Sequence, residues 1–175
     1  MKSDEELVAL ANKGDADAFE ALYYRYRDWV YRLARRFTGS GADALDVLQE
    51  TFGYLLGKFP GFKLTASMTT FLYPVVKHTA LATRRKSRRF ASDEEALSDM
   101  PVRTVQGTSR AELAVVLGLL GDEQREVLLM RFVDDMSLKE ISAALGIPLG
   151  TVKSRLHHAL QKLRGDKHTR DYFLA

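Results

Sequence analysis

The densest cluster of charge in this 175-residue chain is a basic run at residues 84–89, which reads Arg-Arg-Lys-Ser-Arg-Arg. Five cations within six residues can bind the phosphates of a nucleic acid. Lys77 and His78 precede the run, together with Phe71 and Tyr73, whose rings are of the kind that stacks on unpaired bases. A solvated helix end with both rings in a hydrophobic core would account for the same residues. The run is therefore a candidate nucleic-acid-binding segment.

A second candidate nucleic-acid-binding element occupies residues 137–164. Ser137 and Glu140 have the spacing of a capping box, which predicts the start of a short helix. Gly146 is the residue type that a left-handed turn at a helix C-terminus favours. From residue 149 to 164 the chain has four cations and no acid. This order is typical of a helix-turn-helix that enters a DNA major groove, although an ordinary helical hairpin with a solvated basic face has the same pattern.

A third candidate surface lies on a predicted helix around residue 46. Val47, Leu48 and Phe52 form the apolar stripe of this helix. Helical spacing places four side chains close together on the opposite face: Leu45, Asp46, Gln49 and Glu50. This face is either an ordinary solvated surface or a docking surface for another protein.

The residues that enzymes and metal sites require are missing from the sequence. The chain has no cysteine, which excludes disulfides, thiolate zinc sites and thiol nucleophiles. It also has no GxxxxGK[ST], HExxH, GxSxG or SxxK motif. His157 and His158 would point about 100° apart on a helix, which makes them poor ligands for one metal ion. We therefore expect no catalytic residue, no metal site and no cofactor.

The elements that carry these residues are predicted from apolar periodicity. Asp15 is the expected N-cap of the first long helix, and Pro74 predicts a late start or a kink in the third. No alternating segment predicts a strand, so we expect an all-α fold. Three-four spacing predicts helices over residues 15–37, 43–56, 69–89, 113–120, 122–132, 138–145 and 149–163.

Two small helical domains joined by a flexible linker are expected. The composition, 46% hydrophobic and 28% charged, suits a folded protein, and the net charge of +3 is too small to indicate a partner. Helical periodicity is lost over residues 90–110, which predicts a helical bundle over 1–89, a linker over 90–110 and a helix-turn-helix domain over 111–175. The acidic start of the chain and its short apolar segments predict a cytoplasmic protein without membrane insertion.

Two of these elements resemble parts of the extracytoplasmic-function (ECF) sigma factors of bacterial RNA polymerase. Residues 137–164, above all Gly-Thr-Val-Lys-Ser-Arg at 150–155, resemble the domain that reads the minus-thirty-five promoter element. Residues 43–52 resemble the segment that grips the clamp helices of the polymerase β′ subunit, and residues 14–37 resemble the first conserved sigma helices. The connector is the part that does not match.

The minus-ten helix of the family differs from this chain at three positions. Phe71, His78 and Ala82 stand where the family usually has tryptophan, asparagine and aspartate. Pro74 is also unusual there. These differences bear on the minus-ten sequence preference and on how the helix starts.

The resemblance implies a role for each candidate surface. Contacts to polymerase are implied for Leu45, Asp46, Gln49 and Glu50. Contacts to the minus-ten element are implied for Lys63, Ser67, Phe71, Lys77, His78, Arg84, Arg85, Lys86 and Arg88. Contacts to the minus-thirty-five element are implied for Thr151, Lys153, Ser154, Arg155, His157, His158 and Lys162. The implied partners are core RNA polymerase, through its β and β′ subunits, promoter DNA and an anti-sigma factor.

Two alternatives from other classes remain open at this point. A regulator that binds DNA on its own through residues 137–164 would use the N-terminal bundle to sense a signal or to dimerise. A protein-interaction adaptor made of two helical bundles would bind neither polymerase nor DNA. Within the linker, the acidic stretch 93–99 is either solvated chain or a mimic of RNA in the basic channel of the polymerase.

Overall fold

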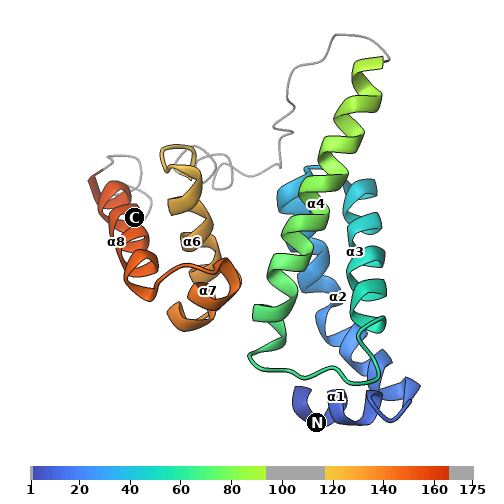
Figure 1. The fold of residues 1–175 in the computed structure, drawn as a ribbon. Helices are drawn as coiled ribbons and strands as arrows, with labels where there is room; N and C mark the ends of the chain where they lie inside the picture. Colours follow the sequence, from blue (N-terminus) through green and yellow to red (C-terminus); the bar gives the residue numbers. More distant parts are fainter. Residues whose placement is uncertain (1, 94–116, 166–175) are drawn as a thin grey trace, which may run out of the picture. The chain divides into compact units, whose positions relative to one another are not determined.

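A computed structural model of the chain describes residues 2–93 and 117–165, with the side chains of 90–93 left out. The chain divides into two compact units, Met1–Leu97 and Ser98–Ala175. Every regular element within the described ranges is an α-helix, so the predicted all-α fold is confirmed (Figure 1). None of these helices is long and apolar enough to span a lipid bilayer.

The N-terminal unit is a bundle of three long helices with a short helix at one end (Figure 1). The short helix is α1 (Asp4–Ala11), and the long ones are α2 (Ala16–Thr38), α3 (Gly41–Leu56) and α4 (Met68–Asp93). The three long helices bury their apolar stripes against one another, as amphipathic helices do. The core includes Leu22, Val30, Leu33, Val47, Leu55, Met68, Leu72 and Val76, each at most 1% exposed.

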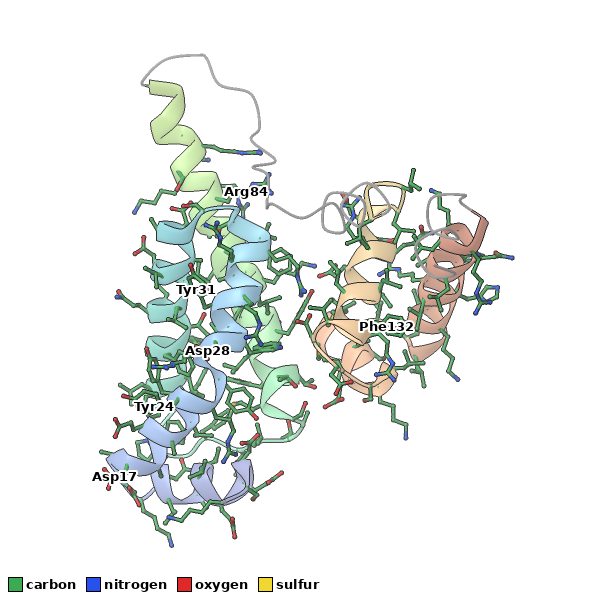
Figure 2. All side chains as sticks on the ribbon, turned by 180° about the vertical axis from the view of Figure 1, so that it is seen from behind. Asp17, Tyr24, Asp28, Tyr31, Arg84 and Phe132 are labelled. Carbon is green, nitrogen blue, oxygen red and sulfur yellow. The ribbon has the colours of Figure 1, made fainter. Side chains whose placement is uncertain are left out.

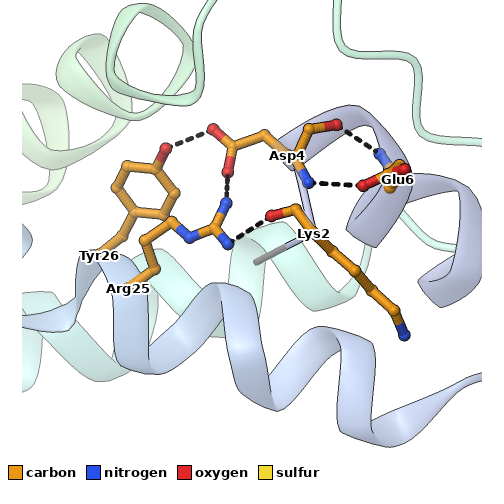
Figure 3. A network of polar contacts seen from close by, with 6 residues as sticks. Lys2, Asp4, Glu6, Arg25 and Tyr26 are labelled. Carbon is orange, nitrogen blue, oxygen red and sulfur yellow. Dashed lines mark hydrogen bonds and ion pairs between the residues drawn. The ribbon is translucent and has the colours of Figure 1, made fainter.

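Helix α1 was not predicted from the sequence. Its N-cap is Ser3, which forms a capping box with Glu6. The Asp4 carboxylate accepts hydrogen bonds from the Arg25 guanidinium and the Tyr26 hydroxyl, both on α2 (Figure 3). Arg25 also donates to the backbone carbonyl of Lys2 at 2.7 Å. This polar network fastens α1 to α2, and burial of Leu7, Val8 and Ala11 completes the contact.

The helix starts in this unit follow their capping residues. Asp15 is the N-cap of α2, as predicted, and its carboxylate accepts the Ala18 N–H at 3.1 Å. Ser40 caps α3, which starts at Gly41, two residues before the predicted start at 43. Of the late start or kink expected from Pro74, the late start is wrong: Ser67 accepts the Thr70 N–H and α4 starts at Met68, one residue before the predicted 69. The kink stays a prediction.

Pro74 lies inside α4 and does not end it. Its ring is exposed, so it meets solvent rather than the bundle core. The missing N–H leaves the carbonyl of Thr70 without its usual helical donor, and the helix nevertheless continues to Asp93, four residues past the predicted end at 89. The rest of the predicted linker lies outside the described residues.

The C-terminal unit consists of α6 (Asp122–Phe132), α7 (Leu138–Leu145) and α8 (Leu149–Gly165) in the range described. Leu120, Leu128 and Ala159 form a core cluster that the partly buried Leu117, Leu156, Leu160 and Leu163 extend. The predicted helix over 113–120 lies mostly outside the described residues. The other three predicted helices of this unit are confirmed within two residues at each end.

The turn between α7 and α8 has the predicted geometry of a helix-turn-helix. Ser137 accepts the Glu140 N–H at 3.2 Å while the Glu140 carboxylate accepts the Ser137 N–H at 2.8 Å, which is the predicted capping box. Gly146 has φ +65°, in the left-handed region that favours glycine, and ends α7. The Ser142 hydroxyl donates to the Ile147 carbonyl at 2.6 Å and holds the chain where it turns into α8.

Candidate functional site

The candidate docking face of α3 is exposed along its whole length. Leu45 is 52% exposed, and Asp46, Gln49 and Glu50 are exposed beside it. Ala44, Val47 and Leu48 are buried on the opposite side. A solvent-exposed leucine among carboxylates offers both apolar contact area and negative charge, so this face suits a partner with cationic side chains.

The same face forms one wall of a groove of about 290 Å³ between α3 and α4. The Ser87 hydroxyl donates to the Asp43 carboxylate across this groove, at 3.3 Å. The groove is lined by Asp43, Asp46, Gln49 and Glu50 of α3 and by Thr83, Lys86 and Ser87 of α4. Three carboxylates face one ammonium group here, so the groove carries net negative charge. Lys86 belongs to this groove and is thereby separated from the other cations of the basic run.

The remaining cations of α4 fall on two adjoining stripes, because successive residues of a helix turn by about 100°. Seven-residue and four-residue spacing aligns Lys77, Arg84 and Arg88 on one stripe. The same spacing aligns Phe71, His78 and Arg85 on the next. Arg85 and Arg88 are exposed, and Arg84 is half-buried where it projects from α4 (Figure 2). Lys77 is half-buried and His78 is exposed.

The two aromatic residues that precede the basic run lie in different surroundings. Tyr73 is 1% exposed and packs edge-on against Phe37, so the core interpretation is confirmed for this residue. Phe71 is half-buried, with its ring centroid 4.8 Å from that of Phe62 and stacked at 6.4 Å on that of Tyr54. Phe71 therefore remains a candidate for contact with a base, at the edge of an aromatic cluster.

Side-chain hydrogen bonds hold the segment between α3 and α4 at two places, its middle and its end before α4. The Asn12 amide donates to the Phe62 carbonyl at 2.8 Å and accepts from the Gly61 and Phe62 N–H groups at 2.7 and 2.9 Å. At the end before α4, the Ser67 hydroxyl lies 2.8 Å from the Thr70 hydroxyl. Lys63 is exposed on the loop between these anchors, and Ser67 is half-buried. Sequence reasoning missed Asn12, whose bonds span about 50 residues of chain.

The outward face of α8 presents most of the residues predicted for it. Val152 and Ala159 are buried on the inner side. Thr151 is half-buried at the start of the helix. The side chains exposed on the outer side are Lys153, Ser154, His157, His158 and Lys162. This face has cations and hydrogen-bond donors and no acid, which suits phosphates and base edges.

Arg155 differs from the other residues predicted on α8. Its guanidinium forms an ion pair with the Glu123 carboxylate of α6 at 2.7 Å, and its side chain is 23% exposed. The pair ties α8 to α6 within the C-terminal unit. Any contact of Arg155 with DNA must be made beside this carboxylate or in competition with it.

The C-terminal unit also exposes an apolar pair that the sequence analysis did not single out. Phe132 is 62% exposed at the end of α6 (Figure 2). Val133, which follows it as the C-cap, is 63% exposed. Exposed side chains of this size are a common feature of protein contacts. Across residues 2–93 and 117–165, no group of three or more His, Cys, Asp or Glu side chains could hold a metal ion.

Comparison with known proteins adds to this geometry. The family described as Sigma-70 region 2 matches residues 22–90, and Sigma-70 region 4 matches residues 116–165. The ECF RNA polymerase sigma factor SigW of Bacillus subtilis is 30% identical over 94% of this chain and 95% of its own length. The chain belongs to the ECF sigma factors. This sigma factor therefore binds core RNA polymerase and directs it to specific promoters, recognising minus-ten and minus-thirty-five elements.

Other relatives are similar over comparable lengths. The RNA polymerase sigma-E factor of Streptomyces avermitilis is 34% identical over 90% of this chain and 89% of its own. Among solved structures, CnrH in complex with the cytosolic domain of CnrY has a TM-score of 0.68 at 24% identity and covers 92% of this sigma factor and 94% of that chain. The sigma factor RpoE of Bartonella quintana, in complex with the anti-sigma factor NepR, has a TM-score of 0.64 at 17% identity, covering 90% and 97%. These two structures share the fold.

Proposed function

We propose that the two units of this sigma factor divide promoter recognition between them. The N-terminal unit, over residues 1–89, grips polymerase and opens and reads the minus-ten region. The C-terminal unit, over 111–175, reads the minus-thirty-five region, and residues 90–110 link the two. The observation that carries this proposal is the sorting of charge on the N-terminal unit, where acids line the α3 groove and cations lie on the two stripes of α4. Opposite charges kept apart on one bundle suit two partners of opposite charge.

The α3 face is the proposed contact with the β′ subunit of polymerase. Leu45 would provide apolar contact, while Asp46, Gln49 and Glu50 would bind cationic and polar side chains. Lys86 lines the groove beside these carboxylates, so we reassign it from the minus-ten set to this surface. There it limits the net negative charge of the groove and leaves the remaining charge for polymerase.

The two stripes of α4 and the preceding loop are the proposed minus-ten contacts. Lys77, Arg84 and Arg88 would bind phosphates, and Phe71, His78 and Arg85 would lie against the separated strand. Lys63 and Ser67 belong to the loop that would receive a base extruded as the duplex opens. Phe71, half-buried beside an aromatic cluster, would stack on a base with the part of its ring that is exposed.

Helix α8 is the proposed reader of the minus-thirty-five element. Thr151, Lys153 and Ser154 stand at its start, where a recognition helix approaches base edges. His157, His158 and Lys162 continue the exposed face toward the phosphates. Arg155 would reach DNA from its position beside Glu123.

We also infer an anti-sigma partner and a cytoplasmic site of action. The two solved relatives named above are each bound to a second protein, CnrY or NepR, and NepR is named an anti-sigma factor. Such a partner of this chain would cover the helical faces that otherwise meet polymerase, the α3 face above all. The protein would act where polymerase is, and would itself carry out no covalent chemistry.

The test is transcription in vitro with core polymerase on promoters selected from random DNA by the assembled holoenzyme. Glu50→Ala should weaken core binding and leave binding of the minus-thirty-five duplex unchanged. Lys153→Ala should weaken binding of the minus-thirty-five duplex and leave core binding unchanged. Glu20→Ala, which removes an exposed acid from α2, is the matched control for Glu50→Ala and should change neither. Specific binding of duplex DNA without initiation at any selected promoter would refute the proposal in favour of an autonomous regulator.

A further inference from the structure

The Asn12 side chain uses both atoms of its amide to hold the start of the loop before α4. It satisfies the N–H and the carbonyl of Phe62 as well as the N–H of Gly61, at distances of 2.7 to 2.9 Å. Gly61 has φ +103°, a backbone conformation that L side chains rarely adopt. The chain thus turns sharply at Gly61, and Asn12 is the side chain that pairs with its backbone at the turn.

We propose that Asn12 is a positioning residue for promoter opening: it sets the loop 63–66 in the geometry that receives the minus-ten base. This inference rests on the proposed function of that loop. It makes α1 and the turn after it a part of the opening machinery, although neither carries any residue of the proposed DNA contacts.

The loop between the two anchors is short and fixed at both ends. Asn12 holds residues 61–62, and Ser67 caps α4 through the Thr70 N–H and lies 2.8 Å from the Thr70 hydroxyl. Four residues separate these anchors, and Lys63, Thr65 and Ala66 among them are exposed. A short loop with both ends fixed has little conformational freedom to lose when it binds a base. Loss of the hydrogen bonds from Asn12 would give the loop more conformational freedom and lengthen the stretch of chain between its fixed points.

The position of Phe62 connects this anchor with α4. Phe62 is 8% exposed, and its ring centroid lies 5.5 Å from that of Phe59 and 4.8 Å from that of Phe71. Phe71 lies on the same stripe of α4 as His78 and Arg85. The hydrogen bonds to the Phe62 backbone therefore also fix the ring on which Phe71 packs.

Helix α1 holds Asn12 in place independently of the loop. Asn12 is the C-cap of α1, and its own backbone N–H bonds to the preceding turn. Asp4 at the other end of α1 binds Arg25 and Tyr26 of α2 (Figure 3). The anchor is thus attached to α2 through contacts that do not involve the loop or α4.

The test compares Asn12→Ala, Asn12→Asp and Asp15→Ala in the full chain, each assembled with core polymerase on a promoter selected by the wild-type holoenzyme. Asn12→Ala loses all three hydrogen bonds, and Asn12→Asp keeps the acceptor but loses the donor to Phe62. Asp15→Ala is the matched control, because it removes the N-cap of α2 from the same turn without touching the loop. Two readouts are measured: permanganate reactivity of thymines in the opened region, and discrimination against a substituted base at the minus-ten position of a fork template.

We expect Asn12→Ala to keep core binding within about twofold and to slow opening by about fivefold. This is the low end of the cost of leaving polar groups unpaired, because the N–H and carbonyl of Phe62 are only part-buried. Base discrimination in Asn12→Ala should fall together with the rate of opening. Asn12→Asp should lie between the wild type and Asn12→Ala in both readouts. Asp15→Ala should lower thermal stability and leave base discrimination as in the wild type. If Asn12→Ala opens the promoter and discriminates bases as the wild type does, the inference is overturned while the proposed function stands. Equal losses of opening and base discrimination in Asn12→Ala and Asp15→Ala would overturn it in the same way. If the wild-type holoenzyme opens no selected promoter, the proposed function fails and the inference with it.

Discussion

The ion pair between Arg155 and Glu123 permits a sharp test of how α8 meets DNA. The guanidinium of Arg155 lies 2.7 Å from the Glu123 carboxylate, whose side chain is 70% exposed. If Arg155 contacts the minus-thirty-five element, Glu123 competes with the DNA for it. Glu123→Gln removes the competing charge and keeps the shape of the side chain. We therefore predict that Glu123→Gln raises affinity for the duplex and that Arg155→Ala lowers it.

The size of the effect follows from the exposure of the pair. Pairs with one well-exposed partner contribute at most about 1 kcal/mol, so the gain in affinity should not exceed about fivefold, at 1.4 kcal/mol for each factor of ten. Arg155→Ala should remove about one phosphate contact, which makes the slope of log affinity against log salt shallower by about 0.9. Neither substitution touches the α3 face, so core binding should stay unchanged in both.

The assay is fluorescence anisotropy of a labelled minus-thirty-five duplex, titrated with each holoenzyme at several salt concentrations. Lys139→Ala, which removes an exposed cation from α7, serves as the charge control for Arg155→Ala. One result would refute this reasoning: Glu123→Gln loses as much affinity for the duplex as Arg155→Ala, and the variant with both substitutions loses no more. The only role of Arg155 would then be to hold α8 against α6, without contact to DNA. Loss of core binding in Arg155→Ala would refute the division of labour between the units.

Three further outcomes are expected from local structure. Gly146→Ala should destabilise the C-terminal unit by about 1 to 2 kcal/mol, because φ is +65° there, and thermal unfolding measures it. Ser137→Ala should cost about 1 kcal/mol by the same measurement, through loss of the capping box. Burial and then the Asp4 carboxylate raise the pKa of the Tyr26 phenol, so its contribution to stability holds below the ordinary tyrosine pKa and is lost as pH rises through the raised value. In Asp4→Ala the folded-state pKa of Tyr26 should fall toward its ordinary value, so Tyr26 ionises at lower pH. Tyrosinate absorbance measures this ionisation, with Tyr26→Phe as the blank.

Local signals were sufficient for most helix boundaries. Asp15, Ser137 and Gly146 act on residues within one turn of themselves, so a single sequence reveals them. The start of α4 shows the limit of this reasoning. Pro74 costs a hydrogen bond wherever it stands in a helix interior, but the capping Ser67 and the buried Leu72 and Val76 outweigh that cost.

Helix α1 was missed because its stability comes mainly from contacts far along the chain. Eight residues are too few for a stable isolated helix. Ser3 and Glu6 have the spacing of a capping box, a signal that was available in the sequence. The bonds from Asp4 to α2 and from Asn12 to the loop join residues 21 to 50 positions apart, and no local pattern predicts them.

The candidate surfaces were found from the sequence, but their limits were not. The basic run was treated as one site, although helical rotation alone separates Lys86 from Arg84 and Arg88. That Lys86 faces the acids of α3 depends on how the two helices pack. Arg155 shows the same limit, because its pairing with Glu123 depends on the approach of α6 to α8.

The position of α1 has a practical consequence for fragment design. The region 2 match begins at residue 22, inside α2, so a fragment trimmed to it would lack α1, Asn12 and the first turns of α2. Such a fragment would leave the backbone of Gly61 and Phe62 without their side-chain partner and bare the apolar surface that Leu7 and Val8 cover. An affinity tag fused before Lys2 would sit directly beside the carbonyl that Arg25 binds. Fragments of this unit should therefore keep α1 and the residues before it, and carry any tag at their other end.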